Sequence, residues 1–128
     1  MKLLLDTHTA IWMMNKHARL PSGVKAMLLD EENTLYISIV SAWEVAIKVS
    51  LGKLPELPGG VKKFLSEAEE LPITLLPIAP RHIEIVETLP LLHRDPFDRL
   101  LVAAAMAEGM TLLTADENIH RYDVPSVW

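Results

Sequence analysis

The sequence contains no cysteine. It therefore has no disulfide framework, no thiol nucleophile and no zinc ribbon, so any metal site must use carboxylates, carbonyls or histidine. Oxygen ligands of this kind favour hard cations. The five histidines are scattered along the chain, and no pair has the spacing of a zinc site on one helix.

Long hydrophobic runs are also absent. The longest, Leu100–Ala107, is well short of the roughly 18 residues that indicate a membrane helix. The run Lys2–Leu5 meets Asp6 too early for a signal peptide. We expect a cytoplasmic protein with no membrane association, and we expect residues 1–128 to form one domain with a single sizeable core.

Positive charge is in deficit, since the formal net charge is -5. Proteins that coat nucleic acid nonspecifically neutralise many phosphates with lysine and arginine, so this balance argues against that class. It does not exclude a nuclease, because a metal ion supplies positive charge at the reacting phosphate. The mean hydropathy of +0.23 is high. It indicates either a sheet covered on both faces or an apolar surface that binds a partner.

Short apolar runs alternate with helical patterns along the chain. The runs are continuous rather than alternating, as expected for strands buried on both faces: Lys2–Leu5, Leu35–Ile39, Ile73–Ile78, Thr111–Thr114 and, more weakly, Val124–Trp128. The helical patterns are His8–Asn15, Ser22–Asp30, Ala42–Leu51, Val61–Glu70, Arg81–Leu89, Pro96–Glu108 and Glu117–Arg121. This alternation predicts an α/β fold with a parallel sheet of four or five strands and helices on both sides.

Acidic residues stand where these runs stop or a helix starts. They are Asp6, Glu44, Asp98 and Asp116. Ligands of open parallel sheets bind beyond the carboxyl ends of the strands, so we expect these side chains to share one crevice. Carboxylates brought together repel unless a cation intervenes. Mg²⁺ or Mn²⁺ fits such an oxygen-rich site.

Each acid also has a structural explanation. Ser41 and Glu44 have the spacing of a capping box, in which Ser41 is the N-cap. Asp95 and Asp98 have the same spacing around Pro96. Asp6 and Asp116 can equally be caps. For each acid considered alone, helix capping is the favoured interpretation. For the acids considered together, a metal site is the favoured interpretation.

Other residues carry weaker signals. Lys48 lies four residues after Glu44 and is interpreted as its helical ion-pair partner. We interpret His93 as a loop or partner contact, and Trp12 and Trp43 as core or interface residues. Arg99, beside Asp98, is a candidate to hold a phosphate of the substrate, to hold a partner's carboxylate, or to orient Asp98. Thr114 is a further candidate to support the acids or to contact substrate.

Longer segments carry a family resemblance across nearly the whole chain. In order they are Leu3–His8, Ser41–Glu44 with Lys48 and Gly52–Leu54, His93–Leu101, and Thr114–Asp116. An isolated Ser-x-x-Glu has no diagnostic value, but these segments in this order are specific. The chain resembles the PIN-domain nucleases, and within them the VapC-like toxins of toxin–antitoxin pairs.

The resemblance implies a three-layer α/β/α fold with Asp6, Glu44, Asp98 and Asp116 as the acidic catalytic and metal-binding site. Asp98 is preferred to Asp95 because the family's later acid opens a helix and precedes a small and aliphatic stretch. The principal metal ligands are expected to be Asp6 and Asp98.

The resemblance to these toxins also implies an endoribonuclease that depends on Mg²⁺ or Mn²⁺ and hydrolyses RNA with metal-activated water. A small cognate antitoxin and a homodimer are the expected protein partners. The alternatives are a PIN-type nuclease in RNA processing or DNA cleavage without an antitoxin, and a noncatalytic interaction module.

Overall fold

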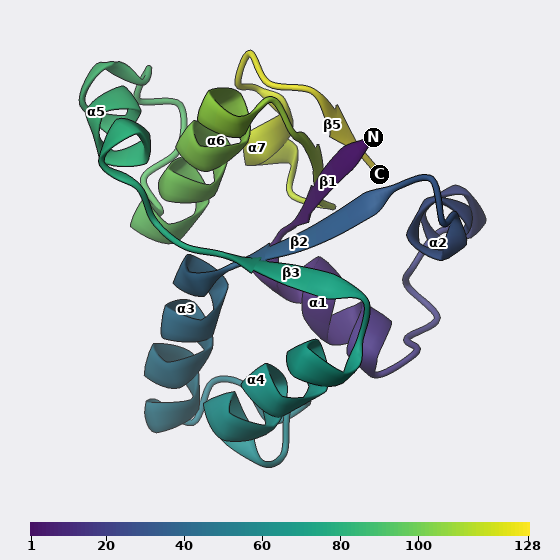
Figure 1. The fold of residues 1–128 in the computed structure, drawn as a ribbon. Helices are drawn as coiled ribbons and strands as arrows, with labels where there is room; N and C mark the ends of the chain where they lie inside the picture. Colours follow the sequence, from purple (N-terminus) through teal and green to yellow (C-terminus); the bar gives the residue numbers. More distant parts are fainter.

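One parallel β-sheet organises the chain, and the computed structural model describes all of residues 1–128. The strands are β1 (Lys2–Leu5), β2 (Thr34–Ser38), β3 (Ile73–Leu76), β4 (Thr111–Leu113) and β5 (Ser126–Val127). Their order across the sheet is β3-β2-β1-β4-β5, and every pairing is parallel (Figure 1). The predicted parallel sheet is confirmed, with five strands.

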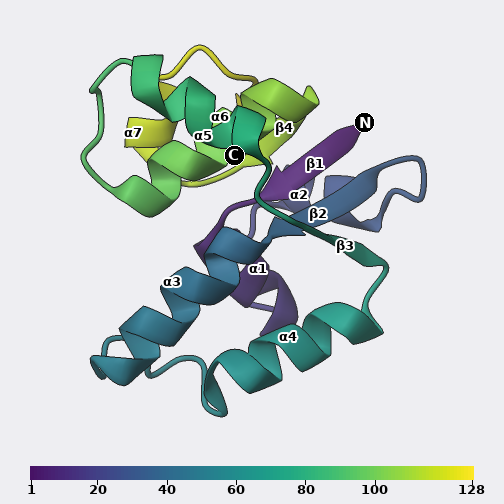
Figure 2. The same cartoon turned by 60° about the vertical axis from the view of Figure 1, so that its left-hand side comes forward.

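Helices cover both faces of this sheet. One layer contains α1 (Thr7–Met14), α2 (Ser22–Leu29), α3 (Ile39–Ser50) and α4 (Gly60–Glu70), and the other contains α5 (Pro80–Thr88), α6 (Pro96–Glu108) and α7 (Glu117–His120). Figures 1 and 2 show α5, α6 and α7 grouped on one side and α1, α3 and α4 on the other. The expected three-layer α/β/α sandwich is therefore confirmed.

The continuous apolar strands follow from this layering. In β1, Leu3 and Leu5 belong to the core beneath α1, α3 and α4, whereas Leu4 belongs to the core beneath α6 and α7. Leu113 and Leu112 of β4 divide between the two cores in the same way. Because successive strand side chains point to opposite faces, a sheet buried on both faces needs every position to be apolar.

All strands except β1 end earlier than the sequence predicts. The strand predicted at Thr111–Thr114 ends at Leu113, and only Ser126–Val127 of the predicted Val124–Trp128 is a strand. The strand predicted at Leu35–Ile39 ends at Ser38, because α3 begins directly at Ile39. The strand predicted at Ile73–Ile78 ends at Leu76. Pro77 follows, and proline has no N–H to donate to a strand ladder. None of the helices has the combination of length and apolar character that crossing a membrane requires.

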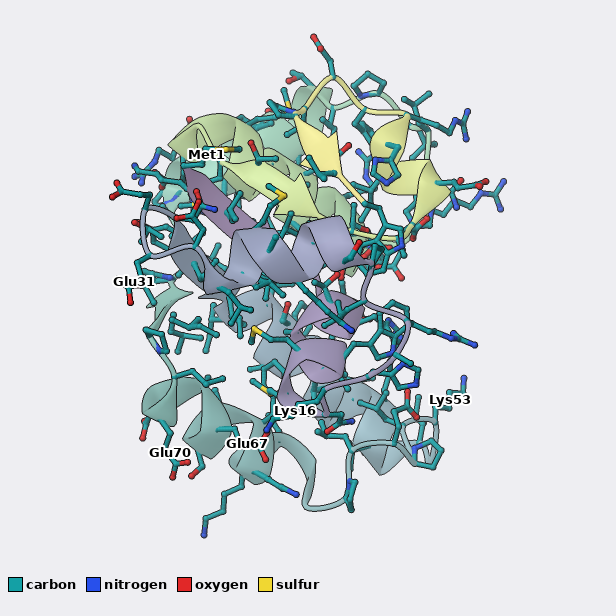
Figure 3. All side chains as sticks on the ribbon, turned by 90° about the vertical axis from the view of Figure 1, so that its right-hand side faces the viewer. Met1, Lys16, Glu31, Lys53, Glu67 and Glu70 are labelled. Atoms are coloured by element: carbon teal, nitrogen blue, oxygen red, sulfur yellow. The ribbon has the colours of Figure 1, made fainter.

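The strand order places a crevice beside β1. The chain moves from β1 to β2 and β3 on one side, then returns to β4 on the other. In register, Leu5 pairs with Ile37 of β2 and Leu113 of β4, so the three strands end together. Such a switch point is where open parallel sheets bind ligands. Elsewhere, charged side chains such as Glu31, Glu67 and Glu70 project away from the ribbon (Figure 3).

Candidate active site

An acidic cavity of about 410 Å³ opens at this edge of the sheet. The structure brings all four predicted acids to its wall, although they come from four separate segments of the chain. Asp95 joins them as a fifth carboxylate. The acidic residues that line the cavity are Asp6, Glu44, Asp95, Asp98 and Asp116.

Asp6 is both a helix cap and a wall of the cavity. Its Oδ1 accepts a hydrogen bond from the Thr9 N–H at 2.8 Å, which caps α1. Its Oδ2 accepts a hydrogen bond from the Thr114 hydroxyl, which follows β4. Burial raises the pKa of Asp6, and the hydrogen bonds from Thr114 and Thr9 oppose that rise. The same carboxylate therefore caps α1 and lines the acidic cavity.

Glu44 lies inside α3 and is buried. The predicted capping box at Ser41 is wrong: Ser38 is the N-cap, and its hydroxyl accepts from the Val40 N–H at 3.1 Å. Because the helix starts earlier, Glu44 is beyond the reach of the cap. Its Oε1 accepts from the Thr7 hydroxyl at 2.6 Å, and its Oε2 pairs with Lys48, which confirms the predicted ion pair.

Asp98 stands in the first turn of α6. Asp95 is the N-cap, as predicted, and its Oδ1 accepts from the N–H groups of Phe97 and Asp98 at 2.8 and 3.1 Å. Burial raises the pKa of Asp98 to about 7, with further contributions from the negative charges of Asp95, Glu44 and Asp116. The repulsion among neighbouring carboxylates that the sequence predicts therefore acts on the carboxyl group of Asp98.

Asp116 and Thr114 complete the edge. Asp116 caps the short α7 through the Asn118 N–H at 2.8 Å. The Thr114 hydroxyl accepts from the Asp116 N–H at 3.0 Å while it donates to Asp6. Thr114 therefore links the two strand-end acids through its hydroxyl group.

His93 is a site residue that sequence reasoning assigned elsewhere. Its Nε2 lies 2.8 Å from Asp98 Oδ2 and 3.6 Å from Asp116 Oδ2. These residues offer three donor atoms within 4.8 Å of one another. The sequence signals were its position two residues before Asp95 and its place at the start of the segment His93–Leu101 that carries the family resemblance. Neither gave the direction of its side chain, because a loop residue has no periodicity.

Comparison with known families decides the assignment of this fold. The PIN domain model matches residues 3–125. The chain belongs to the PIN domain family. The match extends from β1 to the residue before β5, so it includes every acid of the cavity.

Relatives of this PIN domain include a ribonuclease. The chain is 28% identical over 130 residues to ribonuclease VapC22 of Mycobacterium tuberculosis, and the match covers 98% of each chain. Among solved structures, VapBC2 of Rickettsia felis, bound to a promoter DNA fragment, has a TM-score of 0.74 at 20% identity and covers 100% of this chain and 99% of that one. FitAcB of Neisseria gonorrhoeae has a TM-score of 0.66 at 22% identity, with 98% and 96% covered. The structural matches establish the fold.

The donor set of this PIN domain fits a divalent cation. Lys48 is the only lysine on the wall of a cavity that five carboxylates surround, and it is already paired with Glu44. Carboxylate oxygens suit Mg²⁺ and Mn²⁺, and an imidazole nitrogen is also compatible with Mn²⁺. The closest donor atoms belong to Asp98, Asp116 and His93, whereas the sequence paired Asp98 with Asp6 as principal ligands.

Arg99 lies outside the cavity. Its guanidinium donates to the carbonyls of Pro90, Val86 and Leu89 and to the Tyr122 hydroxyl, at 2.9 to 3.3 Å. These bonds occupy the guanidinium, and Arg99 does not line the acidic cavity, so the structure does not support a contact with a substrate phosphate, one of the three roles that the sequence suggested. The Tyr122 hydroxyl in turn accepts from the His93 N–H at 3.0 Å, so Arg99 helps to fix the loop that carries the site histidine.

Proposed function

We propose that this PIN domain is a metal-dependent endoribonuclease that hydrolyses RNA phosphodiester bonds and acts as the toxin of a toxin–antitoxin pair. The observation that carries the proposal is the cavity lined by five carboxylates, in which Asp98, Asp116 and His93 converge. Full-length similarity to ribonuclease VapC22 supports the choice of RNA as substrate.

Each site residue has a role in this proposal. Asp98 and Asp116 would hold Mg²⁺ or Mn²⁺, with Asp6 facing the same cavity. When bound, such a cation activates water for attack and neutralises charge that develops on the phosphate oxygens. Glu44 is fixed by Thr7 and Lys48, so its carboxylate orients water or completes the ligand set. Thr114 keeps Asp6 and Asp116 at a set separation.

Cleavage products test the reaction. With Mg²⁺ or Mn²⁺, the purified protein is expected to cut single-stranded RNA into fragments with 5′-phosphate and 3′-hydroxyl ends, because water rather than the RNA 2′-hydroxyl attacks the phosphorus. A single 2′-deoxy substitution at the cut site should leave cleavage intact. Fragments that end in a 2′,3′-cyclic phosphate would refute this step, and RNA left whole at every metal concentration would favour a noncatalytic interaction module.

The toxin role adds a small antitoxin that covers the cavity. Support comes from the solved relatives, several of which are VapBC or FitAB complexes. Expression of the chain alone should arrest bacterial growth, and co-expression of a small DNA-binding protein encoded immediately upstream should relieve the arrest. Growth that is unaffected by an active nuclease would leave RNA processing or DNA cleavage as the function.

We also propose a homodimer in solution. Exposed hydrophobic side chains surround a groove of about 510 Å³ along α3, α5 and α6, and Trp43, Ile83 and Leu91 are 55%, 53% and 75% exposed. A second copy of the chain would bury this surface, which is unusually apolar for a free monomer. Light scattering at micromolar concentration should give twice the chain mass, and a monomer mass would contradict the proposal.

A further inference from the structure

One wall of the acidic cavity carries no carboxylate. It is formed by His8 and Trp12 of α1 and by Arg19, which precedes α2. Of the 12 residues that line the cavity, only Trp12 and Ala115 are hydrophobic. Trp12 is therefore the one lining residue that offers a broad apolar ring face beside the acids.

Trp12 sits at the centre of a group of rings. Its ring centroid lies 5.8 Å from those of His8 and His17 and 5.6 Å from that of Trp128. The indole is half-buried and packs on the core beneath α1, so its position is fixed while part of the ring lines the cavity. We refer to His8, Trp12, His17 and Trp128 as the Trp12 cluster.

Arg19 adds a free positive charge to this wall. Its Cζ lies 5.7 Å from the centroid of a Trp12 ring, and its side chain has no acidic partner within ion-pair distance. Lys48, the other strong cation of the cavity, is neutralised by Glu44. A planar guanidinium over an indole occupies the place where a planar base would stack.

An acidic chain cannot bind RNA through general charge attraction. Its affinity must come from local contacts, and stacking of unpaired bases on aromatic side chains is the strongest contact that does not depend on net charge. Bases within a duplex are already stacked on one another, so they cannot use such a surface without being extruded.

We propose that the Trp12 cluster is a nucleotide-binding platform for single-stranded RNA. An unpaired base next to the scissile phosphate stacks on Trp12, and Arg19 moves from the ring to the neighbouring phosphate. This inference rests on the proposed RNA hydrolysis and adds the residues that select an unpaired substrate. Trp12 and Arg19 are specificity-determining residues in this scheme.

Binding without cleavage tests the platform. The Asp98→Asn protein is titrated with a short fluorescent single-stranded RNA, alone and combined with Trp12→Leu, which keeps an apolar side chain but removes the ring. The dissociation constant should rise by roughly 5- to 150-fold. Trp12→Phe should restore most of the affinity, and affinity for a duplex of the same sequence should not change. Leu29→Ala, at an exposed apolar residue of α2 that does not line the cavity, is the control and should bind as the parent does.

Two further measurements separate stacking from a structural effect. In the otherwise unaltered chain, Trp12→Leu should raise KM for single-stranded RNA while kcat is retained. Arg19→Ala, at an exposed residue, should reduce the salt dependence of binding by about one phosphate contact. If Trp12→Leu fails to fold, the Arg19→Ala result decides the proposal, and an unchanged salt dependence would overturn it.

Failure of the proposed function and failure of the Trp12 platform give different results. Absence of RNA binding by the Asp98→Asn parent, together with absence of cleavage by the unaltered chain, would remove the proposed function itself. A parent that binds RNA, with a folded Trp12→Leu variant that binds it equally well, would overturn only the platform.

Discussion

Replacement of Asp98 by asparagine is expected to abolish RNA cleavage while it stabilises the metal-free protein at alkaline pH. Activity should fall on the order of 10³-fold or more, because the stabilisation of a phosphate transition state by a held cation amounts to several kcal/mol. Stability should change in the opposite direction, because asparagine has the same shape and carries no charge. Cleavage assays and thermal melts in a chelator measure the two effects.

The pH dependence of the melting temperature shows whether the charge of Asp98 causes this difference in stability. In the folded protein burial raises the pKa of Asp98 to about 7, from its ordinary value of 3.8. Between about pH 4 and pH 7 the folded state therefore binds a proton that the unfolded state releases, and the free energy of unfolding falls as the pH rises. The melting temperature of Asp98→Asn should exceed that of the unaltered protein by roughly 5–15 °C at pH 8, and the difference should shrink towards pH 4.

A matched control separates the site from general charge effects. Glu70→Gln removes one negative charge at the exposed end of α4, where the side chain projects away from the ribbon (Figure 3), and Glu70 does not line the cavity. It should change neither activity nor the pH dependence of melting. An Asp98→Asn protein that melts lower than the unaltered chain at pH 8 would show that the carboxylate serves mainly the helix start.

Divalent metal is expected to raise the melting temperature substantially. A ligand that binds only the folded state at 100 times its Kd adds about 2.7 kcal/mol to the free energy of unfolding, or roughly 10 °C for a chain of this size. Part of this gain arises because the cation removes the repulsion among Asp95, Asp98, Glu44 and Asp116. Thermal melts across Mg²⁺ and Mn²⁺ titrations provide the measurement.

Variants locate the bound ion. Asp98→Asn and Asp116→Asn should each lose most of the metal-dependent rise, and a chelator should reverse it in the unaltered protein. The Glu70→Gln control should retain the full rise. No shift at millimolar metal would show that the folded protein does not bind the ion. An equal shift in all variants would place the bound ion outside the acidic cavity.

The sequence predicted the sheet well because its signals were local. Uninterrupted apolar runs required strands buried on both faces, and the two cores that divide Leu3 and Leu5 from Leu4 explain that pattern. The end of β2 was less predictable. The predicted strand ran through Ser38 to Ile39 and the predicted cap was Ser41, whereas in the structure Ser38 is the last residue of β2 and the cap of α3.

The sequence named the four acids that share the cavity and two residues that contact them, Thr114 and Lys48, but it did not indicate that His93 and Trp12 line the same cavity. The placement of Asp6 and Asp116 could be predicted because each residue follows a strand that ends at the same edge of the sheet. His93 and Trp12 were assigned other roles, since a loop histidine and a helical tryptophan gain their direction only from tertiary contacts. For Arg99 the sequence suggested a role at the site that the structure does not show. Arg99 is next to Asp98 in the sequence, but its guanidinium lies outside the cavity.

The hydrogen bond from Thr114 to Asp6 joins residues 108 positions apart. Because synthesis makes β1 before β4, a nascent chain that ends before Thr114 lacks both this hydrogen bond and the carboxylate of Asp116. Such a chain has an incomplete acidic cavity, whatever part of the sheet it has already formed.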